Sequence, residues 1–168
     1  MKTTFVIGLT LLLVESAFGD ETGDFNGYHY RAVTSRLNYD QAQGRCISYG
    51  GYLVHIKSSR QQSFLANMAS AASGSGYWIG CSDRQTEGDW RWSDGSPLSY
   101  THWYVRQPDD YKGAQDCGIL RDDYDFFHWD DAGCTGTYYS LCQIGRISHT
   151  PNEIATTEIS IAANTGLR

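Results

Sequence analysis

The chain has 168 residues, a formal net charge of −6 and an aromatic content of 14%. This length fits one ordinary domain with tails and is sufficient to bury a hydrophobic core. The acidic balance argues against a nucleic acid partner, because phosphate backbones are bound by basic surfaces. It favours a bound cation.

The N-terminal stretch reads as a targeting signal. A lysine precedes the apolar run FVIGLTLLLV, and the small residues Ala17 and Gly19 occupy positions suited to signal peptidase. The run is too short to cross a bilayer. We therefore expect residues 1–19 to be a cleaved signal peptide and the mature protein to begin near Asp20, secreted and extracellular. No later stretch approaches transmembrane length, so we expect no membrane span.

The first predicted elements follow a short N-terminal segment, residues 20–27. YHYRAV, from Tyr28, is rich in aromatic and β-branched residues and predicts a strand. Asn38 is a suitable N-cap for a helix through roughly Tyr49, which two glycines then end. The apolar positions expected on one face of this helix are Tyr39, Ala42, Cys46 and Ile47.

The run YLVHI predicts a second strand. Ser58 or Ser59, followed three residues later by Gln61 or Gln62, has the pattern of a capping box and predicts a second helix. The glycine-rich stretch ASGSG ends it. The expected apolar face of this helix carries Phe64, Leu65 and Met68.

Periodicity fades after GYWIG. About forty residues rich in Gly, Asp, Ser and Trp precede the next predicted strand, CGILR, and a loop of that length in a compact domain is usually functional. FFHWDD and the strand YYSLCQI close the domain. We expect residues 147–168 to form a flexible tail, because they contain no cysteine and no aromatic ring.

Cysteine usage indicates disulfides, because an exported chain meets an oxidising environment. Any four of the five cysteines can form two bridges, in three connectivities for each choice, so spacing alone does not name the pairs. No CxxC zinc knuckle is present. His102 and His128 stand alone in the sequence and are predicted to be packed or surface residues. The cysteines are Cys46, Cys81, Cys117, Cys134 and Cys142.

The stretch QPDDYKGAQDC, residues 107–117, concentrates acids and side-chain amides around one proline. Carboxylate and amide oxygens are the ligands that Ca²⁺ prefers, six to eight at a time. The adjacent Asp130 and Asp131 can supply further oxygens from one short strand. An EF-hand is rejected, because neither acidic stretch, DRQTEGDW or DDYDFFHWDD, fits its glycine and glutamate spacing.

The order of these motifs resembles the C-type lectin-like domain family from about Tyr28 to Gln143. The matching features are a strand, two helices, WIG, WRWSDGSPLSYTHW, QPD, DC, WDD and YYSLCQ. The resemblance implies an α+β fold with two helices flanking small antiparallel sheets, a long calcium-binding loop region, and a domain spanning residues 28–146. It also implies the disulfides Cys46–Cys142 and Cys117–Cys134, and the short form of the family, which lacks an upstream cysteine pair.

The resemblance implies two calcium sites. Where the family usually has glutamate, Gln115 removes a negative charge, whereas Asp130 adds one where the family has asparagine. The implied ligands of the sugar-bearing site are Gln107, Asp109, Gln115, Asp130 and Asp131. Those of the auxiliary site are Asp83, Glu87, Asp110, Gln115 and Asp116.

Sugar specificity is implied by the order of amide and acid. Gln107-Pro108-Asp109 is the family's galactose-type arrangement, with a cis bond before the proline. Tyr111 either stacks on the apolar face of the sugar or is an ordinary loop aromatic. The implied carbohydrate contacts are Gln107, Asp109, Tyr111, Gln115 and Asp130. The five tryptophans, Trp78, Trp90, Trp92, Trp103 and Trp129, are expected in the core.

The sequence therefore predicts a secreted, calcium-dependent lectin for galactose or N-acetylgalactosamine glycans, acting in innate immune recognition or agglutination. The alternative is a calcium-weak or calcium-independent module of the same fold that binds protein, ice or mineral surfaces. An enzyme is not expected, because the sequence shows no arrangement of a nucleophile, a base and an orienting acid. The stretch GSG at 74–76 also lacks the nucleophile-elbow pattern. Cys81, without a family partner, is either a bridge to a second copy in a homodimer or a buried side chain.

Overall fold

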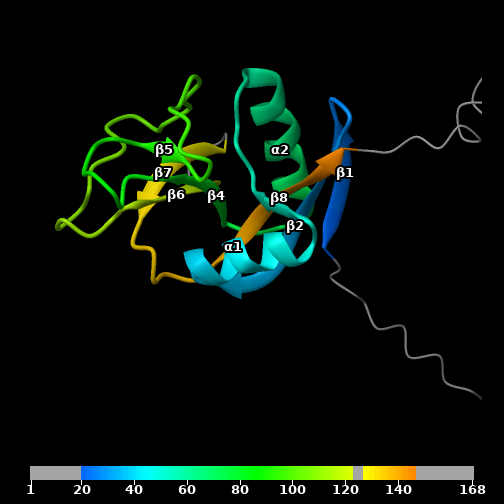
Figure 1. The fold of residues 1–168 in the computed structure, drawn as a ribbon, viewed down its shortest axis with the longest axis horizontal. Helices are drawn as coiled ribbons and strands as arrows, with labels where there is room; N and C mark the ends of the chain where they lie inside the picture. Colours follow the sequence, from blue (N-terminus) through cyan, green and yellow to red (C-terminus); the bar gives the residue numbers. More distant parts are fainter. Residues whose placement is uncertain (1–19, 123–126, 147–168) are drawn as a thin grey trace, which may run out of the picture.

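The computed structural model describes residues 20–122 and 127–146. The predicted signal peptide and C-terminal tail lie outside the described residues. Within the described part, two helices and eight strands form the α+β fold that the sequence predicts (Figure 1). The helices are α1 (Tyr39–Ser48) and α2 (Ser59–Ala71). The strands are β1 (Glu21–Phe25), β2 (Tyr28–Leu37), β3 (Gly51–Leu53), β4 (Gly76–Ser82), β5 (Arg91–Trp92), β6 (Cys117–Arg121), β7 (His128–Ala132) and β8 (Tyr138–Arg146).

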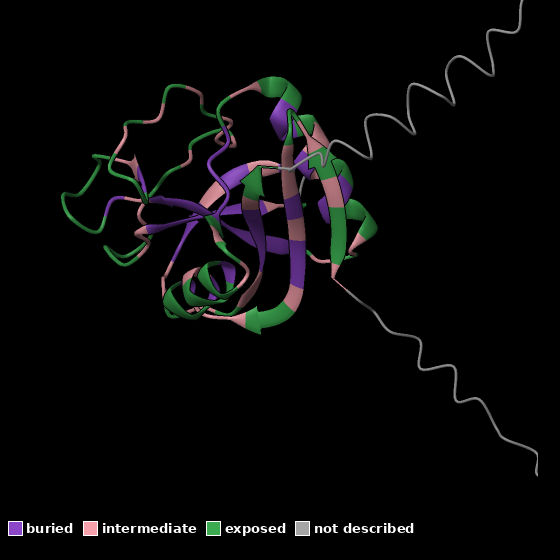
Figure 2. Ribbon diagram, turned by 45° about the vertical axis from the view of Figure 1, so that its right-hand side comes forward, coloured by how far each residue is buried: buried purple, intermediate pink, exposed green. Residues whose placement is uncertain are grey.

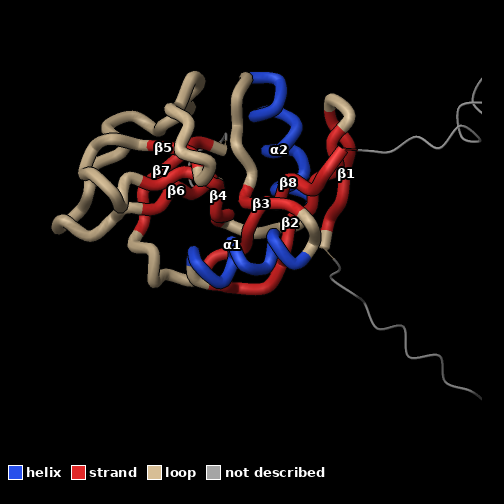
Figure 3. The backbone as a smooth tube through the Cα atoms, viewed as in Figure 1, coloured by secondary structure: helices blue, strands red, loops and turns tan. Residues whose placement is uncertain are grey.

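The strands join in one sheet rather than in the separate small sheets expected. Its order is β1-β2-β8-β4-β6-β7, with β3 on β8 and β5 on β4. All pairs are antiparallel except β4 with β8, which run parallel through Tyr77 opposite Tyr139. The long loops gather beside β5, β6 and β7, on the side away from β1 (Figure 3). The sheet thus has a regular end that holds the helices and a loop-rich end.

Helix α1 begins as its capping residue predicts. The Asn38 side chain accepts a hydrogen bond from the Gln41 amide at 2.9 Å, and the Gln41 side chain accepts one from the Asn38 amide at 3.1 Å. This reciprocal pair satisfies two otherwise free donors at the helix start. The prediction was wrong for Ile47, which is 60% exposed. One residue turns a helix by about 100°, so Ile47 points away from the stripe that buries Cys46.

Helix α2 has half of the predicted capping box. Ser58 caps the helix by accepting from the Gln61 amide at 3.2 Å. The Gln61 side chain does not return the bond but accepts from the Lys57 amide and donates to the His55 carbonyl. The buried Gln61 amide therefore ties the loop before α2 to the core.

Two strand predictions differ from the structure. Strand β1 was missed because its residues ETGDF are mostly exposed and carry no alternating apolar pattern. The strand expected over YLVHI is shorter, since β3 ends at Leu53. Val54 still receives a hydrogen bond from Gly80 and donates one to Leu141, so its backbone bridges β4 and β8 without extending the ladder.

The predicted core tryptophans lie where expected. Trp78, Trp92 and Trp129 are at most 2% exposed. Trp90 and Trp103 are partly buried and pack against the same core. Figure 2 shows the buried residues along the central strands and the exposed ones on the loops, on the outer sides of the helices and at the ends and edge of the sheet. The indole rings thus anchor a loop region that has little regular structure of its own.

Two disulfides join the pairs that the family resemblance implied. Cys46 of α1 bonds to Cys142 of β8, and Cys117 of β6 bonds to Cys134 just after β7. The second bridge links the open end of the β6–β7 hairpin, which carries Asp130 and Asp131. Cys81 is unpaired and fully buried. Of the two roles expected for Cys81, the structure shows the buried side chain, and a bridge to a second copy would require the core to open around it.

Candidate functional site

The long loop between β4 and β6 is held against β7. The Tyr104 amide donates to the Trp129 carbonyl at 2.8 Å, and the Trp129 amide donates to the His102 carbonyl at 2.8 Å. The ring of Trp103 packs edge-on against that of Trp129, with centroids 5.5 Å apart. These contacts fix the loop immediately before Gln107, so that the following residues face the end of β7.

A cavity of about 280 Å³ opens where the loop meets β6 and β7. The Gln107-Pro108 bond beside it is cis. The cavity brings together three of the five residues predicted for the sugar-bearing calcium site, Gln107, Asp109 and Asp130. Its complete lining is Tyr104, Val105, Arg106, Gln107, Asp109, Arg121, His128, Trp129 and Asp130.

Two oxygens in this lining have no hydrogen-bond partner among the described residues. They are Oε1 of Gln107 and Oδ1 of Asp130, and both are buried. A buried oxygen without a partner is costly, and a bound cation is one way to satisfy it. The donor set of one amide and two carboxylates therefore fits a cation that prefers oxygen ligands.

Arg121 forms an ion pair with one member of this oxygen set. Its guanidinium donates to Oδ2 of Asp130 at 2.8 Å. Burial raises the pKa of the Asp130 carboxyl and Arg121 opposes that rise. The protein thus places a positive charge on a carboxylate that a metal would also use.

The other two predicted ligands, Asp131 and Gln115, lie in the network that supports the loop. The Asp131 carboxylate accepts from the amides of Asp109 at 3.1 Å and Asp110 at 2.7 Å. The Gln115 side chain accepts from the Tyr111 amide at 2.8 Å and donates to the Asp131 carbonyl at 2.7 Å. Only an amide carries both the donor and the acceptor for these two bonds, so glutamine suits this role better than glutamate.

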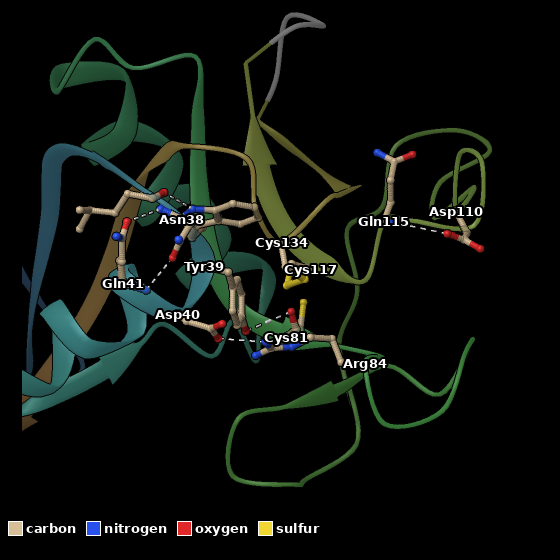
Figure 4. The surroundings of a disulfide bond; sticks show 12 residues. Asn38, Tyr39, Asp40, Gln41, Cys81, Arg84, Asp110, Gln115, Cys117 and Cys134 are labelled. Carbon is tan, nitrogen blue, oxygen red and sulfur yellow. Dashed lines mark hydrogen bonds and ion pairs between the residues drawn. A yellow bond between two sulfur atoms is a disulfide. The ribbon is translucent and has the colours of Figure 1, made fainter.

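The same network leads to the predicted auxiliary site. Oδ1 of Asp110 accepts from the Gln115 amide at 3.0 Å, a contact drawn in Figure 4. Carboxylate oxygens of Asp83, Glu87 and Asp116 lie within 4.8 Å of one another. The structure therefore gathers three of the five predicted auxiliary ligands and connects the remaining two to each other.

The acids of the auxiliary cluster are electrostatically strained. Oδ2 of Asp83 accepts from the Gly88 amide at 2.9 Å, whereas Oδ1 is buried without a partner. Burial, followed by the charges of neighbouring acids, raises the pKa of Asp83. Desolvation and the surrounding acids likewise raise the pKa of Glu87. A divalent cation would relieve both the missing contact and the repulsion.

Tyr111 is exposed and does not line the cavity. Its side chain is 63% accessible, and the Lys112 ammonium lies 5.1 Å from its ring centroid. This exposure is compatible with both roles expected for Tyr111, a stacking platform and an ordinary loop aromatic.

Sequence reasoning missed several residues of the cavity, among them Arg106, Arg121 and His128. His128 was treated as isolated, but its ring stacks on His102 with centroids 4.7 Å apart and planes 7° apart. The misses at Arg121 and His128 have one cause. Arg121 and His128 are paired across β6 and β7, and the sequence did not specify the register of that hairpin.

The family model described as "Lectin C-type domain" matches residues 35–144. The chain therefore belongs to the C-type lectin domain family, as the motif order predicted. This family and its fold are those of non-enzymatic carbohydrate-binding modules, which agrees with the expectation that the chain is not an enzyme.

Individual proteins support the same class. An alpha-N-acetylgalactosamine-specific lectin of Patiria pectinifera is 30% identical over 128 residues, covering 71% of this chain and 76% of the relative. The C-type lectin CEL-I of Cucumaria echinata superimposes with a TM-score of 0.69 at 26% identity, covering 76% of this chain and 96% of that one. A Ca²⁺-dependent type II antifreeze protein, in its Ca²⁺-free form, has a TM-score of 0.67 at 30% identity, covering 74% and 98%.

Neither helix in residues 20–122 and 127–146 is long and apolar enough to cross a membrane.

Proposed function

We propose that this chain is a secreted, calcium-dependent lectin that recognises galactose or N-acetylgalactosamine in glycans, in innate immune recognition or agglutination. One observation carries the proposal. Gln107, Asp109 and Asp130 line a single cavity, and buried oxygens of Gln107 and Asp130 lack partners among the described residues. This is the arrangement that a metal-assisted sugar site requires.

Calcium held by Gln107, Asp109 and Asp130 would bind two neighbouring hydroxyls of the sugar. The acidic cluster of Asp83, Glu87 and Asp116 would hold a second ion. Asp131 then has a positioning role, because its carboxylate holds the amides of Asp109 and Asp110. Gln115 keeps the Tyr111 end of the loop attached to Asp131.

Specificity follows from the order of donor and acceptor along the loop. The Gln107 amide donates to a sugar hydroxyl, and the Asp109 carboxylate accepts from the other. Exchanging the two groups reverses the directions of these hydrogen bonds, so a different arrangement of hydroxyls fits. The N-acetylgalactosamine specificity in the name of the Patiria pectinifera relative is consistent with the galactose-type order.

Affinity chromatography tests the proposal. Retention on galactose-agarose in calcium and release by EDTA are expected, with mannose-agarose as the control column. The double variant Gln107→Glu, Asp109→Asn should lose galactose retention and gain mannose retention while keeping its sensitivity to EDTA. Galactose retention that survives chelation, or no retention by either column, would refute the lectin proposal.

Two observations favour a second candidate, a calcium-weak module that binds protein or mineral surfaces. Arg121 already supplies a positive charge to Asp130, and Gln115 is hydrogen-bonded within the loop. Calorimetric titration with calcium separates the two candidates. Binding of one or two ions below about 10⁻³ M supports the lectin, and no heat of binding supports the second candidate.

Secretion is proposed from the signal-like stretch at residues 1–19. Asp20, the expected first residue of the mature chain, is part of the folded domain, since its carboxylate accepts from the Thr34 amide at 3.1 Å. N-terminal sequencing of protein from a eukaryotic culture medium tests this step. A first residue near Asp20 is expected, and retention of the signal would contradict it.

A further inference from the structure

The charges around the cavity are unusual for a site that would bind only neutral sugars. Two arginines, Arg106 and Arg121, line it together with Asp109 and Asp130. The two positive and two negative formal charges cancel. A divalent cation held by the carboxylates, as proposed above, would leave this lining with an excess of positive charge.

The two arginines differ in how they are engaged. Arg121 is held by Asp130 at 2.8 Å. Arg106 is exposed, and no carboxylate of the described residues forms an ion pair with it. Of the two arginines, Arg106 is therefore the one whose guanidinium can bind an anionic group of a ligand.

The position of Arg106 is set by an uncommon backbone conformation. Its φ is 74°, in the left-handed region that arginine rarely adopts, and it directly precedes Gln107. Such conformations persist where the surrounding structure enforces them, and they gather at ligand sites. Here the Gln107 amide donates to the Tyr104 carbonyl at 2.9 Å, which closes the turn around Arg106.

We propose that the cavity takes an acidic galactoside, in which a sulfate ester or carboxylate on the sugar is bound by Arg106. A guanidinium presents paired N–H donors that match the oxygens of either anion. A free anion would gain little, because Asp109 and Asp130 repel it and no sugar hydroxyls compensate. The inference rests on the proposed function, because Arg106 lines the same cavity as Gln107, Asp109 and Asp130, which would hold the sugar.

Competition on immobilised galactose tests the inference. The competitors are galactose, galactose 6-sulfate, galacturonic acid and glucose 6-sulfate, all in calcium. We expect galactose 6-sulfate and galacturonic acid each to reach half-inhibition at a concentration about 1.4- to fivefold below that of galactose, the range of an exposed ion pair. The gain should shrink as salt is raised, because exposed charges are screened. Glucose 6-sulfate should not share it.

Two variants identify the residue. Arg106→Gln should remove the advantage of the acidic sugars, so that on this variant they inhibit no better than galactose does. Arg60→Gln makes the same change of charge at an exposed position of α2 that does not line the cavity, and should keep the advantage. An advantage for only one of the two anions would assign that anion and still supports the inference.

Equal inhibition by galactose and both acidic galactosides would overturn the inference while leaving the lectin proposal intact. An advantage that survives in Arg106→Gln would overturn it as well. Failure of galactose itself to compete in calcium would instead refute the proposed function. The three outcomes are distinguished in one set of inhibition curves.

Discussion

Arg121 should compete with calcium for Asp130. Its guanidinium lies 2.8 Å from Oδ2 of Asp130, and the two side chains are 38% and 15% exposed. If calcium uses this carboxylate, the ion pair must weaken before the metal binds. We therefore expect Arg121→Gln to bind calcium more tightly than the parent chain.

The magnitude follows from the exposure of the pair. A hydrogen bond to a charged group contributes about 1.5–3 kcal/mol when protected, and an exposed ion pair contributes about 0.2–1 kcal/mol. With Asp130 largely buried and Arg121 over one third exposed, about 1 kcal/mol is reasonable, or roughly a fivefold gain in affinity. The calcium-free variant should also be less stable, since Asp130 loses its partner.

Calorimetry gives the calcium affinity, and thermal unfolding with and without calcium gives the stability. Arg91→Gln is the control, because Arg91 forms an ion pair of the same 2.8 Å length with Asp89 and lines no part of this cavity. Its calcium affinity should match the parent. Unchanged or weaker calcium binding in Arg121→Gln would refute the competition.

The remaining predictions concern buried residues outside the sugar site. Burial lowers the pKa of His55 from its ordinary 6.5 to about 4. The unfolded chain therefore binds the proton more readily than the folded one, and the free energy of unfolding should fall by about 3 kcal/mol as the pH drops from about 6.5 to about 4. Urea unfolding should show this loss, and His55→Phe should abolish it. Gly118→Ala should destabilise the fold by roughly 2–4 kcal/mol, because a Cβ there would overlap Sγ of Cys81. An unchanged urea midpoint for Gly118→Ala would show that the core accepts the added methyl group and would contradict this prediction. Cys81 should resist a thiol reagent until the chain unfolds, because burial raises its pKa and leaves it inaccessible; fast labelling of the native protein would show that the core opens.

Local chemistry made much of the regular structure predictable. Asn38 with Gln41, and Ser58 with Gln61, give signals that depend only on residues three apart. Strand β1 gave no such signal, since it is stabilised by pairing with β2 rather than by an apolar face of its own. Element boundaries failed where tertiary hydrogen bonds replaced the ladder, as at Val54.

The candidate site was predictable in composition but not in arrangement. Motif order identified Gln107, Asp109 and Asp130, and the structure brings them to one cavity. Which side chains face the cavity depends on the register of β6 against β7 and on contacts across the loop. The role of Arg121 arises from that register, which no local pattern in the strand CGILR reveals.

Gln115 illustrates how one side chain links the two halves of the site. It accepts from the Tyr111 amide and donates to the Asp131 carbonyl, while Asp131 in turn holds the amides of Asp109 and Asp110. A glutamate would contribute a charge to a metal, but it has no donor for the Asp131 carbonyl when ionised. The amide therefore orders the loop by hydrogen bonds within the protein, where a glutamate would instead offer a charge to a metal. With Arg121 also paired to Asp130, we expect the organisation of this loop to depend less on calcium than that of a site built from carboxylates alone would.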